Sequence, residues 1–310
     1  MLGVLIGFAI IGSVIAAGYL IARLGILGPN QAQVQFVLSR LAFFVLSPAL
    51  LFTVIAKANV HELFSRVLAV SAISAFAAII VFFLIARFAW KRALPEAVVG
   101  SAASGYLNAN NIGLPVAVYV LGNAALSAPV ILLQLVVLAP IILTMLDIST
   151  SGKVSISRVL LQPVRNPLII GVVLGVIVAL LHLHLPTPVL APFVLVGGAA
   201  VPVVLLSFGM SINGAKVMEA GSNRRDVVLA SVLKLVLMPV VAWAVGHFVF
   251  GLTGTGLFGV VLLAALPTAQ NVFNYAQRYD RGVTMARDTV LITTIGAVPI
   301  LVVAAALLER

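Results

Sequence analysis

Long apolar runs separated by short polar stretches repeat along the whole chain. Each run is about 20 residues long, the length that an α-helix needs to cross roughly 30 Å of hydrocarbon. Glycine, proline and asparagine in the intervening loops set the boundaries. The pattern predicts ten transmembrane helices and an all-α polytopic membrane protein, with spans at residues 2–22, 32–56, 66–89, 97–121, 125–146, 167–184, 190–212, 227–250, 256–277 and 286–308.

The composition excludes a soluble domain between these runs. Of the 310 residues, 63% are hydrophobic and 8% are charged, whereas an ordinary soluble domain has roughly 25% charged residues. The longest polar stretches, 147–166 and 213–226, have the size of loops. The sequence has no cysteine, which excludes disulfides and zinc–thiolate sites.

The basic residues give the predicted helices a direction. With the N-terminus outside, fourteen of the 18 Lys and Arg residues fall on the cytoplasmic side, three fall outside, and Lys234 lies within a span. Cytoplasmic loops of membrane proteins carry this excess. The net charge of +10 therefore indicates membrane orientation and not nucleic-acid binding. We expect a plasma (inner) membrane location with both termini extracytoplasmic.

Prolines indicate an internal repeat. They pair between the two halves with offsets of 154, 152 and 159 residues, as Pro48 with Pro202, Pro115 with Pro267, and Pro140 with Pro299. We expect each proline to interrupt its helix, since proline removes a hydrogen-bond donor. A repeat of five helices is odd-numbered, so the second copy must be inverted, as in many secondary transporters. The predicted parts are residues 1–150, a cytoplasmic loop at 151–166, and residues 167–310.

Two of the predicted spans are poor continuous helices. The fourth has asparagines, glycines and a proline at its centre, between Gly105 and Pro115, and the ninth has Pro267 beside Gln270 and Asn271. Irregular backbone at that depth is tolerated only where it faces protein or a wet cavity. Pro115 is suited to begin a half-helix, whose free N–H groups carry partial positive charge. The sequence predicts two broken helices that cross at the membrane midplane.

The candidate substrate-binding residues lie mainly at this crossing. Amides can donate to a carboxylate and accept from a hydroxyl or a sodium ion's shell, so the cluster suits a small polar or anionic solute. The alternative is that the amides only satisfy backbone freed at the breaks. The predicted site consists of Asn108, Asn110, Asn111, Gly113, Pro115, Pro267, Gln270 and Asn271, together with Lys234.

Lys234 is a separate candidate because a charge within the membrane is costly. It lies about a third of the way into the eighth span from the cytoplasmic side. Its long side chain can snorkel to the interface or pair with a structural partner; alternatively it attracts an anionic substrate. Arg40, near the inner end of the second span, is interpreted as an interfacial anchor.

The acidic residues all map to loops or helix ends, which argues against a proton relay by carboxylates. Facilitated transport remains open, and so does coupling to sodium bound by amides, hydroxyls and carbonyls. The histidines fall near outer helix ends without a convergent carboxylate, so we expect no metal site and no cofactor. The acidic residues are Glu62, Glu96, Asp147, Glu219, Asp226, Asp280, Asp288 and Glu309.

The motifs of the fourth and ninth spans resemble those of the auxin efflux carrier family, and the resemblance covers the whole chain. This family includes plant auxin exporters and bacterial permeases proposed for malate, malonate and related acids. Similar segments occur in the second, seventh and eighth spans. The segments are Asn108-x4-Gly113-x-Pro115, Leu266-Pro267-Thr-Ala-x-Asn271 with Ala276-x-x-Tyr279, Ser47-Pro48 to Phe52, Gly197 to Gly209, and Lys234 to Pro239.

The resemblance implies a ten-helix inverted-repeat fold, shared in outline with sodium–bile-acid symporters. Helices 1, 2, 6 and 7 would form a scaffold and helices 3–5 and 8–10 a transport domain with elevator-like movement. Substrate would bind where helices 4 and 9 cross, in contact with Asn108. The loop between the repeats is short, as in bacterial members, which argues against auxin as the substrate.

The sequence thus favours a secondary transporter of small organic anions, either mono- or dicarboxylates. It has no catalytic dyad or phosphate loop, so we do not expect an enzyme. A channel would need a continuous polar stripe, whereas polarity here is concentrated at one depth. A sodium- or proton-coupled exchanger of similar fold is the other alternative, although paired acidic residues at the break are missing. A homodimer and a coupling sodium ion remain open.

Overall fold

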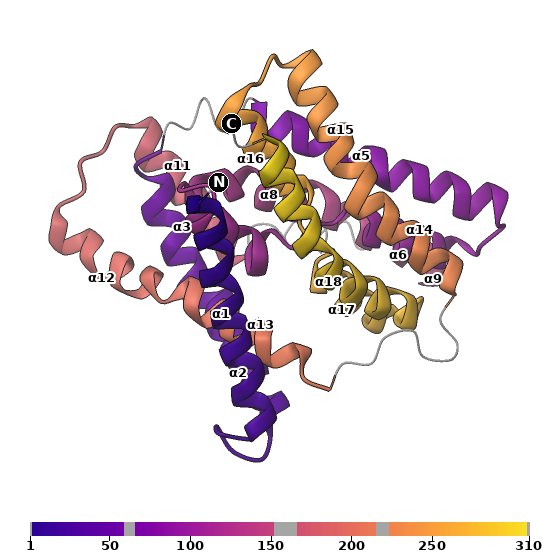
Figure 1. Cartoon of the computed structure of the whole chain (residues 1–310), viewed down its shortest axis with the longest axis horizontal. Helices are drawn as coiled ribbons and strands as arrows, with labels where there is room; N and C mark the ends of the chain where they lie inside the picture. The colour runs from indigo at the N-terminus through magenta and orange to yellow at the C-terminus, as the bar shows by residue number, and fades with distance from the viewer. Residues whose placement is uncertain (1, 59–65, 152–165, 215–222, 309–310) are drawn as a thin grey trace.

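The computed structural model describes residues 2–58, 66–151, 166–214 and 223–308, and their regular elements are helices (Figure 1). In the first half these include short π-helical turns and a 3-10 turn (Ala124–Ser127) that continue several of the α-helices. The α-helices of this half are α1 (Leu2–Leu24), α2 (Gln31–Leu41), α3 (Ser47–Ile55), α5 (Leu68–Leu84), α6 (Leu94–Gly105), α7 (Leu114–Tyr119), α8 (Ala128–Leu132) and α9 (Ala139–Ser151).

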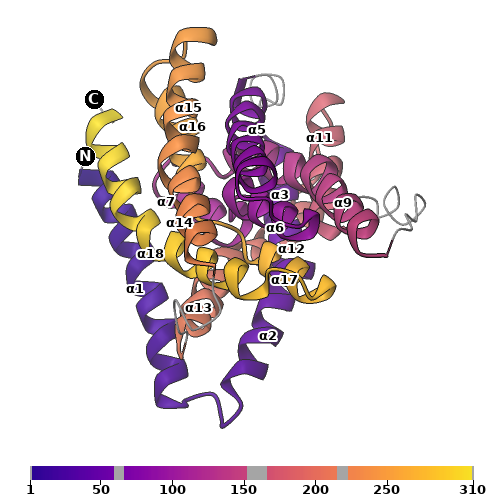
Figure 2. The ribbon, with the colours of Figure 1, turned by 90° about the vertical axis from the view of Figure 1, so that its right-hand side faces the viewer.

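The second half is built in the same way. Its α-helices are α11 (Pro167–Leu180), α12 (Thr187–Gly198), α13 (Ala200–Ile212), α14 (Arg224–Val232), α15 (Met238–Ala244), α16 (Gly254–Ala264), α17 (Gln270–Tyr279) and α18 (Val283–Leu308). The first turn of α1 and the last turn of α18 lie near each other in both views (Figures 1 and 2).

Seven helices in the described ranges are long and apolar enough to cross a membrane. They match seven of the ten predicted spans. Of the other three, the sixth is the shorter apolar helix α11, and the fourth and ninth are each divided into two pieces. The seven long helices cover Ile6–Leu24, Gln31–Ile55, Leu68–Ala89, Ala124–Thr150, Thr187–Ile212, Arg224–Val249 and Val283–Leu308.

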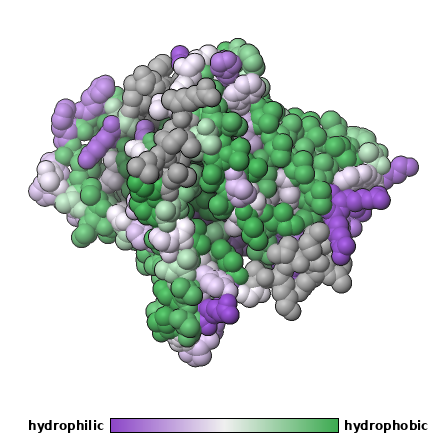
Figure 3. Space-filling view, in the orientation of Figure 1, coloured by the Kyte–Doolittle hydropathy of each residue, from purple (hydrophilic) through white to green (hydrophobic). Residues whose placement is uncertain are grey.

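The surface is largely apolar, as hydrocarbon contact requires. Figure 3 shows hydrophobic residues over most of one face, with hydrophilic residues gathered toward its edges. Large apolar side chains are widely exposed, including Leu195 at 79% and Phe248 at 72%. A soluble monomer seldom exposes apolar patches of more than a few hundred Å². This surface agrees with a protein that lies in a bilayer.

The helices form two groups that lie side by side in Figure 1. In one group, α1 and α2 pack on α13, and α3 packs on α11 and α12. Small residues permit close approach in this group, because a Cβ at Gly18 would collide with the Leu206 carbonyl and one at Gly209 with the Ile15 carbonyl. The other group contains α5, α6, α9 and α14–α18, of which α6 packs on α5, α9 and α14.

Most of the paired prolines do not interrupt their helices as predicted. Pro48, Pro115, Pro140 and Pro239 each follow a π-helical turn by two residues, at Ala42–Leu46, Ala109–Gly113, Leu133–Leu138 and Leu233–Leu237. A π-helical turn is wider and bonds residue i to i−5, so it accommodates the ring and the missing donor. Pro202 lies in the first turn of α13, and Pro299 lies within α18.

Polar contacts on charged side chains join the two halves of the chain. The Arg92 Nε lies 3.1 Å from Asp226 Oδ2, and the Arg281 Nη1 lies 3.5 Å from Glu96 Oε1. The Tyr279 hydroxyl donates to Asp147 Oδ1 at 2.7 Å. Asp147 belongs to α9, which continues to Ser151, so the fifth predicted span, 125–146, ended too early.

Another acidic residue is deeply buried. Asp288 was placed at a helix end, and it occupies the second turn of α18 with no exposed surface. Its Oδ1 lies 3.0 Å from the Arg287 Nη2, so the charge is paired locally. The residues Glu62, Glu219 and Glu309 lie outside the described residues.

The predicted orientation can be tested directly, because the chain has no cysteine. A cysteine at Leu27, in the loop after α1, is expected on the cytoplasmic side, and a cysteine at His184, before α12, on the outer side. A membrane-impermeant maleimide should label His184→Cys in intact cells and Leu27→Cys only after permeabilisation. The reverse labelling would overturn the orientation, and labelling of both in intact cells would contradict the odd number of crossings between them.

Candidate functional site

The breaks in the fourth and ninth spans meet and pair with each other. α6 ends at Gly105 and α16 ends at Ala264, and residues Leu107 and Thr268 then form an antiparallel bridge. The Asn108 N–H donates to the Pro267 carbonyl at 2.8 Å, and the Ala269 N–H donates to the Tyr106 carbonyl at 2.9 Å. The two broken helices therefore contact at their breaks, as the sequence predicted.

Buried side chains satisfy other backbone groups around the breaks. The Thr268 hydroxyl donates to the Ala103 carbonyl at 2.6 Å, and the Thr268 N–H donates to Thr293 Oγ1 at 3.1 Å. The Gln134 side-chain amide donates to the Leu107 carbonyl at 2.8 Å. Unpaired backbone groups are costly where water is absent. The crossing is thus held by hydrogen bonds from both halves.

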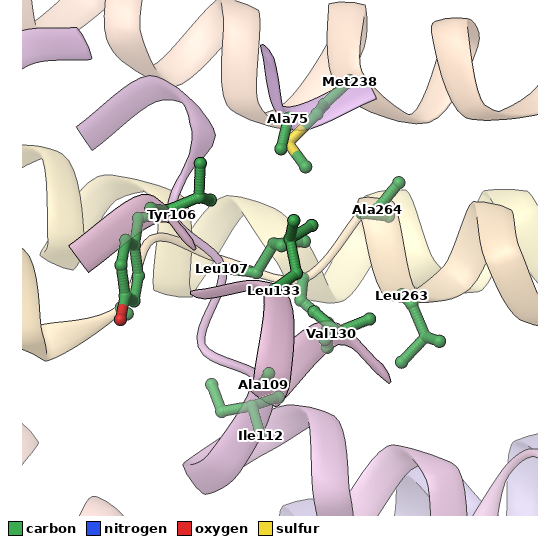
Figure 4. Close-up of a cluster of buried hydrophobic side chains, with 14 of the residues drawn as sticks. Ala75, Tyr106, Leu107, Ala109, Ile112, Val130, Leu133, Met238, Leu263 and Ala264 are labelled. Carbon is green, nitrogen blue, oxygen red and sulfur yellow. The ribbon is translucent and has the colours of Figure 1, made fainter. Parts of the chain in front are cut away.

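Apolar side chains pack around this polar centre. Figure 4 shows Leu107 and Leu133 close together, with Val130 beside them and Leu263 on the neighbouring segment. Of these, Leu107 is 1% exposed and Leu263 is fully buried. This packing shields the hydrogen bonds of the breaks from competing water.

Lys234 donates a hydrogen bond to the C-terminal end of α16, the first part of the broken ninth span. Its side chain has no exposed surface, and its ammonium donates to the Ala264 carbonyl at 2.8 Å and lies 3.2 Å from the Met238 sulfur. Ala264 is the last residue of α16, where the helix dipole places partial negative charge. Lys234 therefore does not snorkel, and it makes a structural pairing.

The second halves of both broken helices begin beside the crossing. Asn108 caps the π-helical turn Ala109–Gly113, since its Oδ1 accepts from the Asn111 N–H at 3.2 Å. That turn continues into α7, so the half-helix begins before Pro115. On the other side α17 begins at Gln270. Free N–H groups at such starts carry partial positive charge.

A cavity of about 370 Å³ opens beside the crossing. This size falls in the range of small-molecule sites, roughly 300–1,000 Å³. Amide side chains provide most of its polar lining, and Arg40 is the one charged side chain among the described residues that line it. The lining amides are Gln35, Asn108, Asn110, Asn111, Gln134, Gln270, Asn271 and Asn274, and the apolar lining includes Phe36, Phe43 and Phe44.

The structure brings together five of the nine predicted site residues in this cavity, namely Asn108, Asn110, Asn111, Gln270 and Asn271. Gly113 packs against the other break, since a Cβ there would lie 2.7 Å from Leu266 Cδ1. Pro115 and Pro267 shape the two broken helices, and Lys234 lies outside the lining. These four residues do not line the cavity, and a role in substrate binding stays a prediction for them.

Part of the amide cluster satisfies its own surroundings. Asn108 serves as a cap, and the Asn110 side-chain N–H donates to Asn111 Oδ1 at 3.0 Å. The Asn110 Oδ1 is buried and has no hydrogen-bond partner among the described residues. Some amide atoms therefore hold the backbone or one another, as the alternative interpretation expects, and binding of a solute by the others stays a prediction.

Several lining residues were not among the predicted site residues, including Gln35, Arg40, Gln134 and Asn274. Gln134 is an amide within an otherwise apolar run, and Asn274 follows Gln270 by one helical turn. These two features of the sequence could have identified Gln134 and Asn274 as candidate lining residues. Arg40 was interpreted as an interfacial anchor, but its side chain lines the cavity. Its guanidinium carbon lies 5.6 Å from the ring centre of Phe36 and 5.2 Å from that of Phe44.

An all-helical chain with repeated membrane-spanning segments and a polar cavity at two broken helices has the architecture of a membrane transporter. The chain belongs to the family described as membrane transport protein, the auxin efflux carrier family, whose model matches residues 4–155 and 151–305. The two matched segments meet near the predicted boundary between the repeats and suggest an internal repeat. The chain is therefore a multi-pass membrane protein and not an enzyme.

Two relatives cover nearly the whole chain. A protein of Rhizobium meliloti (strain 1021) named "putative malonate transporter" is 26% identical over 286 residues, which is 90% of this chain and 87% of the relative. An "uncharacterized transporter" of Methanothermobacter thermautotrophicus is 26% identical over 283 residues, or 90% of this chain and 89% of the relative.

The hydrogen bond from Thr268 to Ala103 can be tested by an isosteric change. Thr268→Val removes the hydroxyl and leaves a buried carbonyl without that donor, so we expect a loss of about 1–3 kcal/mol of stability and a lower Tm of the purified protein. Thr53→Val is the matched control, since the Thr53 hydroxyl donates within its own helix to Leu50. Equal Tm values for the two variants would contradict the role of Thr268.

Proposed function

We propose that this protein is a secondary transporter of small organic anions, mono- or dicarboxylates, with the substrate at the crossing of the fourth and ninth spans. One observation carries the proposal: the cavity beside the crossing is lined by amides and one arginine, and its described lining has no carboxylate. Such a lining favours an anion over a cation. Membership of a transporter family supports movement of that solute across the membrane.

The amides and helix starts would hold one carboxylate. Asn110 and Asn111 lie in the first turn of one half-helix, and Gln270 and Asn271 begin the other. Side-chain N–H groups and the partial positive charge of both starts then converge on one region. A carboxylate accepts several such bonds, and bonds to a charged group are stronger than bonds between neutral groups.

The two groups of helices support alternating access by an elevator-like movement. Gln35 and Arg40 belong to α2, which packs with α13, whereas the amides of α17 belong to the other group. The cavity thus lies between a group corresponding to helices 1, 2, 6 and 7 and a group corresponding to helices 3–5 and 8–10. In the predicted orientation, Gln35 and Asn274 lie toward the cytoplasm, so this state would face inward.

Malonate is the first substrate to test, because a relative bears the name putative malonate transporter. We expect malonate to raise the Tm of the purified protein, since a ligand at about 100 times its Kd adds about 2.7 kcal/mol of stability. A larger rise in sodium chloride than in potassium chloride would assign sodium coupling. No rise with malonate or other mono- and dicarboxylates would count against the proposed substrate class.

The site itself can be tested with Asn108→Asp. Aspartate keeps the oxygen that caps the Asn111 N–H, but it replaces an amide donor with a negative charge. Like charges about 4 Å apart repel by about 4 kcal/mol at an effective dielectric constant of about 20. We therefore expect uptake of radiolabelled malonate into proteoliposomes to fall at least about tenfold. We expect Asn108→Ala, which removes both donor and acceptor, to abolish transport.

A matched control separates the loss of the site from the loss of a helix cap. Asn123 is also a cap, since its Oδ1 accepts from the Ala125 N–H at 3.0 Å, and it does not line the cavity. Asn123→Asp should transport like the wild type. Full transport by well-folded Asn108→Asp protein, or equal losses in both variants, would contradict a substrate site at the crossing.

A further inference from the structure

A polar contact between α2 and α13 lies next to Arg40 and holds it at the cavity. The Ser39 and Ser207 hydroxyls lie 2.6 Å apart, and the Gln35 side-chain amide donates to Ser39 at 2.9 Å. Ser39 precedes Arg40, and both line the cavity with Gln35. The contact fixes the rotation of α2 against α13 and so holds this face of α2 toward the cavity.

The aromatic neighbours of Arg40 leave its hydrogen-bonding capacity largely unused. Phe36 and Phe44 lie one turn before and one turn after it, and their rings attract the cation without accepting conventional N–H···O bonds. Within the described part of the chain, no carboxylate lies at ion-pair distance from Arg40. A guanidinium carries five N–H donors in a planar fork that matches a carboxylate.

Arg40 and the amides lie on different helices that border the same cavity. The amides and half-helix starts at the crossing can hold one carboxylate, as proposed above. Arg40 reaches the cavity from α2, which belongs to the other group of helices. A second carboxylate on the same solute would therefore meet a separate partner, and this one is cationic.

We propose that Arg40 binds the second carboxylate of the substrate and makes the site selective for dicarboxylates over monocarboxylates. This inference rests on the proposed transport of organic anions at the crossing. A carboxylate on a guanidinium makes charge-assisted, bidentate hydrogen bonds. A monocarboxylate held by the amides gains nothing comparable from Arg40.

The test compares malonate with its monomethyl ester, which has one carboxylate and is larger by one methyl group. Both compete with radiolabelled malonate for uptake into proteoliposomes containing the wild type, Arg40→Gln or Arg40→Lys. For Arg40→Gln we expect the half-inhibiting concentration of malonate to rise about tenfold or more, as loss of a charged hydrogen bond implies. The half-inhibiting concentration of the monoester should change less than about threefold. For Arg40→Lys, the half-inhibiting concentration of malonate should lie between the values for the wild type and Arg40→Gln.

Arg23→Gln is the matched control. Arg23 is also an exposed arginine predicted on the cytoplasmic side, and its guanidinium carbon lies 6.0 Å from the ring centre of Tyr19, but it does not line the cavity. We expect it to compete like the wild type. Should Arg40→Gln fail to purify as a stable protein, Arg40→Lys tests the role of Arg40 instead. The quantity compared is again the ratio of the half-inhibiting concentrations of malonate and the monoester.

The outcomes separate this inference from the proposed function. Equal changes for malonate and the monoester in the Arg40 variants, or no change for either, would overturn the role of Arg40 while transport itself stands. A wild-type protein that transports neither malonate nor any other organic acid would overturn both proposals. A selective loss of malonate competition in the Arg40 variants alone would support both.

Discussion

The structure depends on the mutual hydrogen bonding of two breaks in membrane helices. Hydrocarbon offers no water to an unpaired N–H or C=O group, so a break within the membrane needs partners in the protein. Tyr106 and Asn108 find them in Ala269 and Pro267, while Gln134 and Thr268 bond to carbonyls near the breaks. Since the backbone is satisfied in this way, amide side chains of the second half-helices can face a cavity. The cavity, and with it the proposed solute site, follows from the way the breaks are paired.

Lys234 shows how a buried charge can serve this arrangement. Charged side chains inside membranes are usually taken as sites for ions or substrates. Here the ammonium meets a carbonyl at the C-terminal end of α16, where several carbonyls lack helical partners. Each helix has its own dipole, which makes the start of α17 attractive to an anion and the end of α16 attractive to a cation. The break therefore holds the Lys234 ammonium at the end of α16 and presents at the start of α17 a partial positive charge that favours an anion.

The amino-acid sequence predicts the helices well because apolar length and loop composition are local properties. It also predicts the broken spans, since the asparagines and Pro267 conflict with a continuous membrane helix. Proline alone did not predict where helices are interrupted, because π-helical turns before Pro48 and Pro140 accommodate the proline ring. Burial of membrane helices does not produce a clear polar stripe, so nothing local indicated that Arg40 lines the cavity. Its position depends on how α2 packs against α13, which is a tertiary property.

The paired breaks also constrain how the chain is made. Ala103 and Thr268, which share a hydrogen bond, are separated by 165 residues, so the first half emerges from the ribosome long before its partner. During that interval the groups of the first break need another partner, either water or a continuous helical turn. Neither half can reach its final form alone. We therefore expect assembly to finish late, when insertion of the ninth span provides the partners of the fourth.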